Sequence, residues 1–160
     1  MEFKVYRLCR DNKKIKELRE QELKYFLPES IYMSGIELYS FINKVIEDCK
    51  DDYALLCHDD IILPQNIERN VSNCINSANE YLGFNNWGVI GNAGLEIISK
   101  RTITFLSDPH TKVLPYSTKN PIIVESVDGN TMLLNIKALK EKNVSLPKGL
   151  FGYHLYDVIL

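Results

Sequence analysis

Three consecutive polar residues, His58, Asp59 and Asp60, are the strongest candidates for chemistry in this sequence. They directly follow an apolar run over 53–57, which is typical of a buried strand in a parallel sheet. Open α/β sheets bind ligands in the crevice beyond the carboxyl ends of their strands. Two carboxylates and an imidazole at such an end suit a divalent cation. The alternative is a polar turn before the next helix, with His58 partly buried, and this stretch alone does not choose between the two.

Further candidate positions follow other apolar stretches of the chain. Gly91 and Gly94 offer backbone without side chains, which suits close approach to a ligand. A lone Gly-x-x-Gly lacks the lysine of a phosphate-binding loop, so a simple turn is the favoured interpretation. Asp128 begins an Asp-Gly dipeptide, which is common in turns. His154 and Asp157 come near the chain end, where a single histidine is more often structural than a ligand.

The elements that would position these residues alternate between strands and helices. Strands are expected over 3–9, 31–33, 53–57, 87–90, 95–105 and 122–127, and helices over 12–26, 65–82 and 137–142. An apolar stretch over 132–134 follows the turn at Asp128. A further helix is expected to begin at a capping box formed by Ser34 and Glu37. This order predicts βαβ units, and therefore an α/β fold with a mostly parallel central sheet flanked by helices.

Apolar stripes indicate which face of each predicted helix is buried. The stripes are Ile15, Leu18, Leu23 and Phe26 in the first helix, Leu38, Phe41, Ile42, Val45, Ile46 and Cys49 in the second, and Ile67, Val71, Cys74, Ile75, Ala78 and Leu82 in the third. Asp11 is the candidate N-cap of the first helix. The charged residues of the first two helices are expected to face water.

The composition is that of an ordinary soluble globular domain. The chain has 160 residues, of which 45% are hydrophobic and 25% charged, which predicts one domain with its own core. A net charge of −2 gives no argument for nucleic acid as a main partner. The apolar runs are too short to span a bilayer, and no apolar signal-peptide core follows Met1.

The four cysteines, Cys9, Cys49, Cys57 and Cys74, lie far apart in the sequence. None forms a Cys-x-x-Cys pair, so a structural zinc site is not expected. Each lies in an apolar stripe or strand, which predicts buried free thiols in a reducing compartment. The sequence therefore predicts a cytoplasmic protein.

Four segments occur together in an order and spacing that match a known family. They are His-Asp-Asp-Ile at 58–61, Trp-Gly-Val-Ile-Gly-Asn-Ala-Gly at 87–94, Val-Asp-Gly at 127–129, and Leu-Phe-Gly-Tyr-His-Leu-Tyr-Asp at 150–157. The chain resembles glycosyltransferases of the family 2 type with the GT-A fold, especially the small branch related to a streptomycin-biosynthesis protein. The resemblance covers about two-thirds of the chain. It implies a single GT-A-like domain over 1–160 that lacks the usual C-terminal acceptor elements.

The resemblance also implies an activity and roles for named residues. The implied reaction is metal-dependent, inverting transfer of a hexose from a nucleotide-sugar donor, expected to be a UDP-sugar, to a hydroxyl of a glycan or small-molecule acceptor. Asp60 and His154 would bind the divalent metal, Mn²⁺ or Mg²⁺, and Asp157 would be the general base. The residues expected to contact substrates are Asp59, Trp87, Gly91, Gly94 and Asp128.

Departures from the family pattern keep other functions open. Ile159 stands where relatives have a second acidic residue, the chain stops at Leu160 where they continue, and the nucleoside-binding loop after the first strand is not recognisable. The alternative is therefore a non-catalytic or degenerate GT-A-like binding module. A metal phosphohydrolase using His58 and Asp59 is less well supported, because such folds place the pair on helices. A homodimer is a further expectation, since pairing could complete a short domain with apolar helix stripes.

Overall fold

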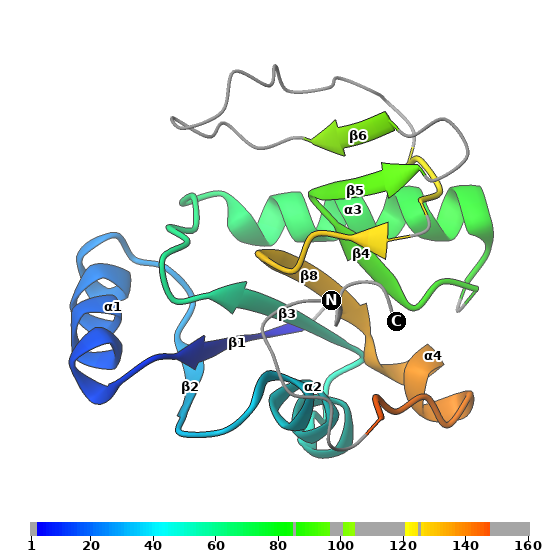
Figure 1. Cartoon of the computed structure of the whole chain (residues 1–160). Coiled ribbons are helices and arrows are strands. Elements are labelled where there is room, and N and C mark those ends of the chain that lie inside the picture. Colours follow the sequence, from blue (N-terminus) through cyan, green and yellow to red (C-terminus); the bar gives the residue numbers. More distant parts are fainter. Residues whose placement is uncertain (1–2, 85, 97–100, 105–120, 125, 148–160) are drawn as a thin grey trace.

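A five-stranded sheet forms the centre of the protein (Figure 1). The computed structural model describes residues 3–84, 86–96, 101–104, 121–124 and 126–147. In sheet order the strands are β2 (Ser30–Ser34), β1 (Phe3–Cys9), β3 (Tyr53–His58), β8 (Thr131–Asn135) and β4 (Val89–Gly91). A second, three-stranded sheet has the order β6 (Arg101–Thr104), β5 (Ala93–Glu96) and β7 (Ser126–Val127).

The central sheet is mixed. β1 pairs in parallel with β2 and β3, whereas β8 pairs antiparallel with both β3 and β4. Four strands therefore share one direction and β8 opposes them. The predicted α/β class is confirmed. The predicted mostly parallel sheet is correct only in that four of the five strands run in the same direction, because the two pairings made by β8 are antiparallel.

Helices flank the central sheet on both faces. They are α1 (Asn12–Lys24), α2 (Leu38–Asp48), α3 (Ile67–Leu82) and α4 (Ile136–Glu141). Figure 1 shows α2 and α4 below the sheet and α3 above it. Within the described ranges, no helix is both long enough and apolar enough to cross a membrane.

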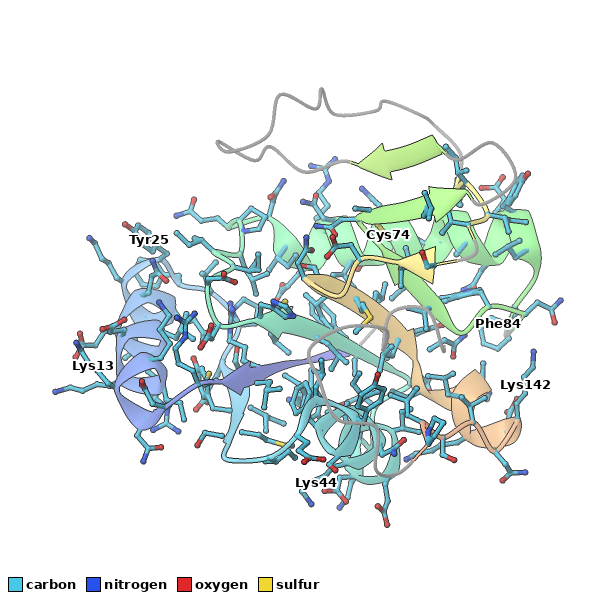
Figure 2. All side chains as sticks on the ribbon, in the orientation of Figure 1. Lys13, Tyr25, Lys44, Cys74, Phe84 and Lys142 are labelled. Carbon is cyan, nitrogen blue, oxygen red and sulfur yellow. The ribbon has the colours of Figure 1, made fainter. Side chains whose placement is uncertain are left out.

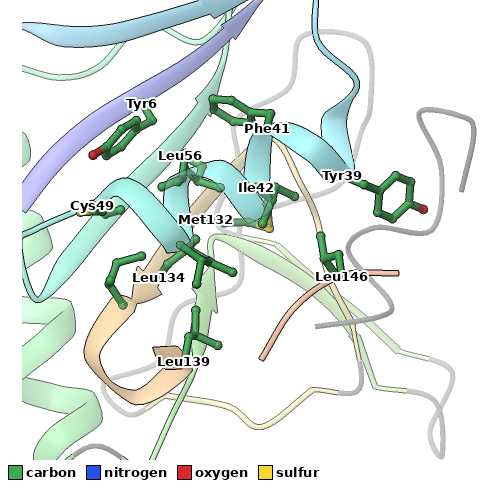
Figure 3. Packing of buried hydrophobic residues seen from close by; sticks show 14 of the residues in the cluster. Tyr6, Tyr39, Phe41, Ile42, Cys49, Leu56, Met132, Leu134, Leu139 and Leu146 are labelled. Atoms are coloured by element: carbon green, nitrogen blue, oxygen red, sulfur yellow. The ribbon is translucent and has the colours of Figure 1, made fainter. Parts of the chain in front are cut away.

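The core on the α2 side confirms the predicted stripe of that helix. All six stripe residues are buried, and Ile42 and Val45 are 0% exposed. They pack against alternate residues of the strands, including Leu56 and Leu134 (Figure 3). Neighbouring strand residues face the other way and join α3 in a second cluster, as the period of two in a strand requires.

The stripe predicted for α1 is only partly correct. Leu18 is buried, but Leu23 is 78% exposed and Phe26 is 93% exposed. Glu22 occupies the inward position instead, four residues after Leu18, and is buried. The helix turns this face inward because Glu22 is the partner of a buried arginine on β1, Arg7. The charged residues Lys13 and Lys44 point away from their helices into solvent, as expected (Figure 2), whereas the burial of Glu22 contradicts the expectation that the charged residues of the first two helices face water.

Of the two predicted N-terminal caps, the one on α1 is confirmed and the one on α2 is not. Asp11 caps α1 as predicted, because its Oδ1 accepts a hydrogen bond of 2.8 Å from the backbone N–H of Lys14. The capping box of Ser34 and Glu37 is wrong. The chain turns at Gly35, which has a φ of 69°, and α2 begins only at Leu38. Glu37 is the N-cap and makes no side-chain capping hydrogen bond.

Three cysteines are buried as predicted and one is not. Cys9, Cys49 and Cys57 are at most 2% exposed, whereas Cys74 on α3 is exposed (Figure 2). All four are free thiols. Burial raises the pKa of Cys9 and of Cys57 to about 11.

Candidate functional site

Residues from three of the four motif segments meet at one edge of the central sheet. The backbone N–H of His58 donates to the carbonyl of Asn130 at 3.0 Å, and the N–H of Asp128 donates to the carbonyl of Ala93 at 2.8 Å. We call the residues His58–Asp60, Gly91–Ala93 and Asp128–Asn130 the polar edge. It lies at the carboxyl ends of β3 and β4 and at the start of β8.

Asp59 is buried in the polar edge and is fully engaged with Arg10, the first residue after β1. Its Oδ1 accepts from Nη2 of Arg10 at 2.8 Å, and its Oδ2 accepts from Nε and from the backbone N–H of Arg10, both at 2.9 Å. These bonds hold the pKa of Asp59 below its ordinary value although burial alone would raise it. Asp59 was expected to contact the donor sugar or ribose. In the structure both of its carboxylate oxygens instead accept hydrogen bonds from Arg10.

Asp60 is the free carboxylate of the polar edge. Its side chain is exposed and forms no hydrogen bond or ion pair with any described residue. A carboxylate oxygen is a hard ligand that suits Mg²⁺ or Mn²⁺. However, the described part of the chain contains no group of three or more His, Cys, Asp or Glu residues that could hold a metal ion. The described residues alone thus do not make up a metal site.

The turn that carries Asp59 and Asp60 is fixed from inside by Arg7. This side chain is 1% exposed, and its Nη1 donates to the carbonyl oxygens of His58 at 3.0 Å and Ile61 at 2.9 Å. The two carbonyls bracket the turn, so the guanidinium sets the path of the backbone between them. Sequence reasoning missed both Arg7 and Arg10. Arg7 could have been found, because a charged residue at an inward strand position needs a buried partner.

A buried carboxylate balances the charge of Arg7. Glu22 on α1 accepts from Nε of Arg7 at 3.2 Å, and from the backbone N–H and hydroxyl of Ser30 at 3.2 and 2.6 Å. The hydroxyl of Tyr32 donates to the same carboxylate. Burial, and then this hydrogen bond, raise the pKa of the Tyr32 phenol above its ordinary value. This network joins β1, α1 and β2, and through Arg7 it reaches the turn after β3.

Asp128 lies on the surface of the polar edge. Its Oδ1 accepts from the backbone N–H of Asn130 at 2.9 Å, which is the hydrogen bond of a local Asx turn. The turn interpretation of the Asp-Gly dipeptide is therefore correct, and the exposed carboxylate remains accessible at the edge.

Gly91 on β4 and Gly94 on β5 are required by the close approach of β7. A Cβ on Gly91 would lie 2.8 Å from Cβ of Val127, and one on Gly94 would lie 2.6 Å from the carbonyl oxygen of Ser126. Both distances are too short for a side chain, so β7 could not lie where it does. The structure thus gives the two glycines a structural role that is independent of any ligand.

Trp87 lies in the core rather than at the polar edge. It is 5% exposed, its Nε1 donates to Oδ1 of Asn79 at 2.8 Å, and its ring stacks on Tyr53 with 5.7 Å between centroids. Tyr53 is the first residue of β3 and His58 is the last. The structure therefore does not bring Trp87 together with Asp59 and Asp60.

The remaining predicted residues, His154 and Asp157, lie outside the described residues. A surface depression of about 620 Å³ lies at the opposite end of β3 from the polar edge, between residues 47–52 and α4. It contains none of the predicted site residues.

No protein-family model matches this chain, and no curated protein matches it either. The family relationship therefore stays a prediction from four segments, three of which fall within the described residues.

Proposed function

We propose that this protein is a metal-dependent, inverting glycosyltransferase of the family 2 type with a GT-A-like fold. The observation that supports it is the convergence of three motif segments on the polar edge through backbone hydrogen bonds. Spacing along the chain does not require this convergence, whereas a shared substrate site does. The carboxyl ends of neighbouring strands are also where α/β sheets bind ligands.

Asp60 is the described residue best suited to a divalent ion in this proposal, because its carboxylate is exposed and unpaired among the described residues. His154 is the second proposed ligand. A bound divalent ion supplies Lewis-acid stabilisation of the leaving diphosphate. Asp128, also exposed at the edge, is proposed to contact the donor sugar or the acceptor.

Asp157 is the proposed general base. It would take the proton from the acceptor hydroxyl, whose oxygen forms a bond to the anomeric carbon as the bond from that carbon to the nucleoside diphosphate breaks. Attack from the face opposite the leaving group inverts the configuration. We propose a UDP-sugar as donor and a glycan or small molecule as acceptor.

Thermal unfolding against a panel of nucleotide sugars, with and without Mn²⁺, tests the proposal. A ligand that binds only the native state stabilises it by about 2.7 kcal/mol at 100-fold excess over its Kd. We expect a rise in Tm that needs both the metal and one donor. Asp60→Ala should abolish the metal-dependent rise in Tm, whereas Asp52→Ala, which removes an exposed carboxylate at the other end of β3, should retain it.

Turnover is tested separately from binding. Asp157→Asn is expected to keep the Tm shift with donor and to lose sugar transfer. Retained transfer by this variant would remove Asp157 as the base, and the absence of any donor-dependent Tm shift in the wild type would contradict the proposal as a whole.

A second candidate function is a GT-A-like module that binds a nucleotide sugar without consuming it. It is favoured by the engagement of Asp59 with Arg10 and by the incomplete ligand set of the described residues. A donor-dependent Tm shift that is independent of metal, with no consumption of donor, would establish this alternative.

The remaining parts of the proposal concern location and assembly. We propose a cytoplasmic location because all four cysteines are free, which is typical of a reducing compartment. A homodimer stays a prediction that sedimentation of the purified chain can test.

A further inference from the structure

We propose that Arg10 binds the diphosphate of the donor and that Asp59 is its positioning residue, an inference that rests on the proposed function. The inference starts from how the guanidinium is shared. Nε and Nη2 of Arg10 donate to the two oxygens of Asp59, so one edge of the planar group is occupied. The other edge, formed by Nη1 and Nη2, has no partner among the described residues.

The free edge matches a phosphate group. Its two N–H donors are parallel and coplanar, which is the arrangement that binds two oxygens of one phosphate at once. The side chain of Arg10 is 64% exposed while that of Asp59 is 9% exposed. The carboxylate is thus a buried support, and the guanidinium presents its free donors to solvent in a fixed orientation.

The pair lies where the sheet is open to a ligand. From β1 the chain passes through α1 to β2 on one side, and from β2 through α2 to β3 on the other side of β1. The carboxyl ends of β1 and β3 therefore flank a topological switch point, where open α/β sheets bind their ligands. Arg10 directly follows β1 and Asp59 directly follows β3, so the ion pair bridges this position.

The local charge decides how Arg10 would bind an anion. Asp59 cancels the charge of the guanidinium, and Asp60 and Asp11 are further acidic groups near it. Net positive charge is therefore not the source of affinity, and directed hydrogen bonds are. A lysine at position 10 would keep the charge but would lose the second edge, so it should not replace the arginine.

Isothermal titration with inorganic pyrophosphate, UDP and uridine, all at one fixed Mg²⁺ concentration, tests the inference. Arg10→Gln and Arg10→Lys should each weaken pyrophosphate and UDP binding by about tenfold or more, the loss expected for a charge-assisted bidentate contact. Uridine, which has no phosphate, should be unaffected. Arg19→Gln is the matched control, because it removes an exposed arginine of α1 whose guanidinium lies over the ring of Tyr32 and outside the polar edge, and it should stay within about twofold of the wild type.

The outcomes separate this inference from the proposed function. Pyrophosphate and UDP affinities of Arg10→Gln within about twofold of the wild type would overturn the role of Arg10, even where nucleotide sugars are consumed. Affinities lost in both Arg10 variants, with no nucleotide sugar bound or consumed by the wild type, would support the anion site and remove the glycosyltransferase proposal. Wild-type protein that binds neither pyrophosphate nor UDP would overturn the inference.

A measurement on the wild type covers the case in which Arg10→Gln does not fold. The side-chain Nε–H resonance of Arg10 is assigned by its absence from the spectrum of Arg10→Lys. We expect this resonance to shift on addition of pyrophosphate while that of the buried Arg7 stays in place. A resonance that does not move at saturating pyrophosphate would overturn the inference.

Discussion

Two of the clusters that pack against the central sheet are built in opposite ways. The ionic cluster of Arg7, Glu22, Ser30 and Tyr32 ties β1, α1 and β2 together with directed hydrogen bonds. The α2 core, formed by the buried stripe of α2 and its partners on β3 and β8, holds the other side by apolar contact (Figure 3). Hydrogen bonds fix angles as well as distances, whereas apolar burial is non-directional.

The difference follows the location of the candidate site. Arg7 contacts the carbonyls that bracket the turn bearing Asp59 and Asp60, while the α2 core lies under the middle and amino-terminal part of β3. A buried ion pair adds little net stability compared with apolar residues of similar volume. We infer that the ionic cluster mainly sets the geometry of the polar edge and that apolar burial, of which the α2 core is one part, supplies most of the stability.

The largest expected effect comes from breaking the ionic cluster. Arg7→Met leaves Glu22 buried without its cation and the carbonyls of His58 and Ile61 without their donor. Removing one partner of a buried pair costs about 3–5 kcal/mol, so we expect a loss of that size in the unfolding free energy, measured with urea. A loss below about 1 kcal/mol, the level of a surface pair, would show that the network is not held as described.

A truncation in the α2 core is expected to lower the unfolding free energy by less than Arg7→Met does, and to do so without changing the polar edge. Ile42→Ala removes a side chain that is 0% exposed, and such a truncation costs about 2–5 kcal/mol through lost burial and the cavity left behind. We expect the turn after β3 to keep its geometry, so amide hydrogen exchange at His58 should match that of the wild type in Ile42→Ala and increase in Arg7→Met. Equal exchange in the two variants would contradict the division of roles.

The sequence predicts the buried face of a helix correctly where that face is apolar and incorrectly where it contains a charged residue. The stripe of α2 is apolar throughout, so spacing alone identifies its buried face correctly. The inward face of α1 contains Glu22, and hydrophobic periodicity misassigned Leu23 and Phe26 to the core. Hydrophobic periodicity does not identify Glu22 as buried, because its burial depends on its partner Arg7, which is 15 residues away on another element.

The site was predictable in its location but not in its internal contacts. The sequence identifies each segment of the polar edge as a polar or glycine-containing stretch after an apolar run, and the residues that follow β3, β4 and β7 meet at one edge. Nothing in the local sequence shows that Asp59 would be taken by Arg10, that Trp87 would stack on Tyr53, or that Gly91 would be needed by Val127. These contacts join residues far apart in the chain, and only the tertiary structure sets them.

Acid should distinguish the Asp59–Arg10 ion pair of the polar edge from the α2 core. Arg10 holds the pKa of Asp59 below its ordinary value, which is about 3.9 in an unfolded chain. Its contribution to stability is therefore complete above that pH and is lost as the pH falls through the lower, folded pKa. The difference in unfolding free energy between wild type and Asp59→Asn should be constant from about pH 7 to pH 5 and shrink below about pH 4.

Ile42→Ala serves as the control, because its loss of burial involves no proton and should be the same across this range. A difference between wild type and Asp59→Asn that stays constant down to pH 2 would mean that Arg10 does not bind the charged form of Asp59 preferentially.

The smallest expected effects lie at the two helix starts, which repeat the contrast between directed and apolar contacts. Asp11→Ala removes the oxygen that accepts from the N–H of Lys14 at the start of α1, and loss of such a cap costs about 1 kcal/mol. Ser34→Ala should cost less than about 0.5 kcal/mol, because α2 begins at Leu38 and its N-cap, Glu37, makes no side-chain capping hydrogen bond. Asp11→Asn, which keeps an acceptor oxygen, should restore most of the loss at α1. A larger loss for Ser34→Ala than for Asp11→Ala would show that α2 depends on a local cap, and the apolar stripe would then be insufficient to fix where that helix begins.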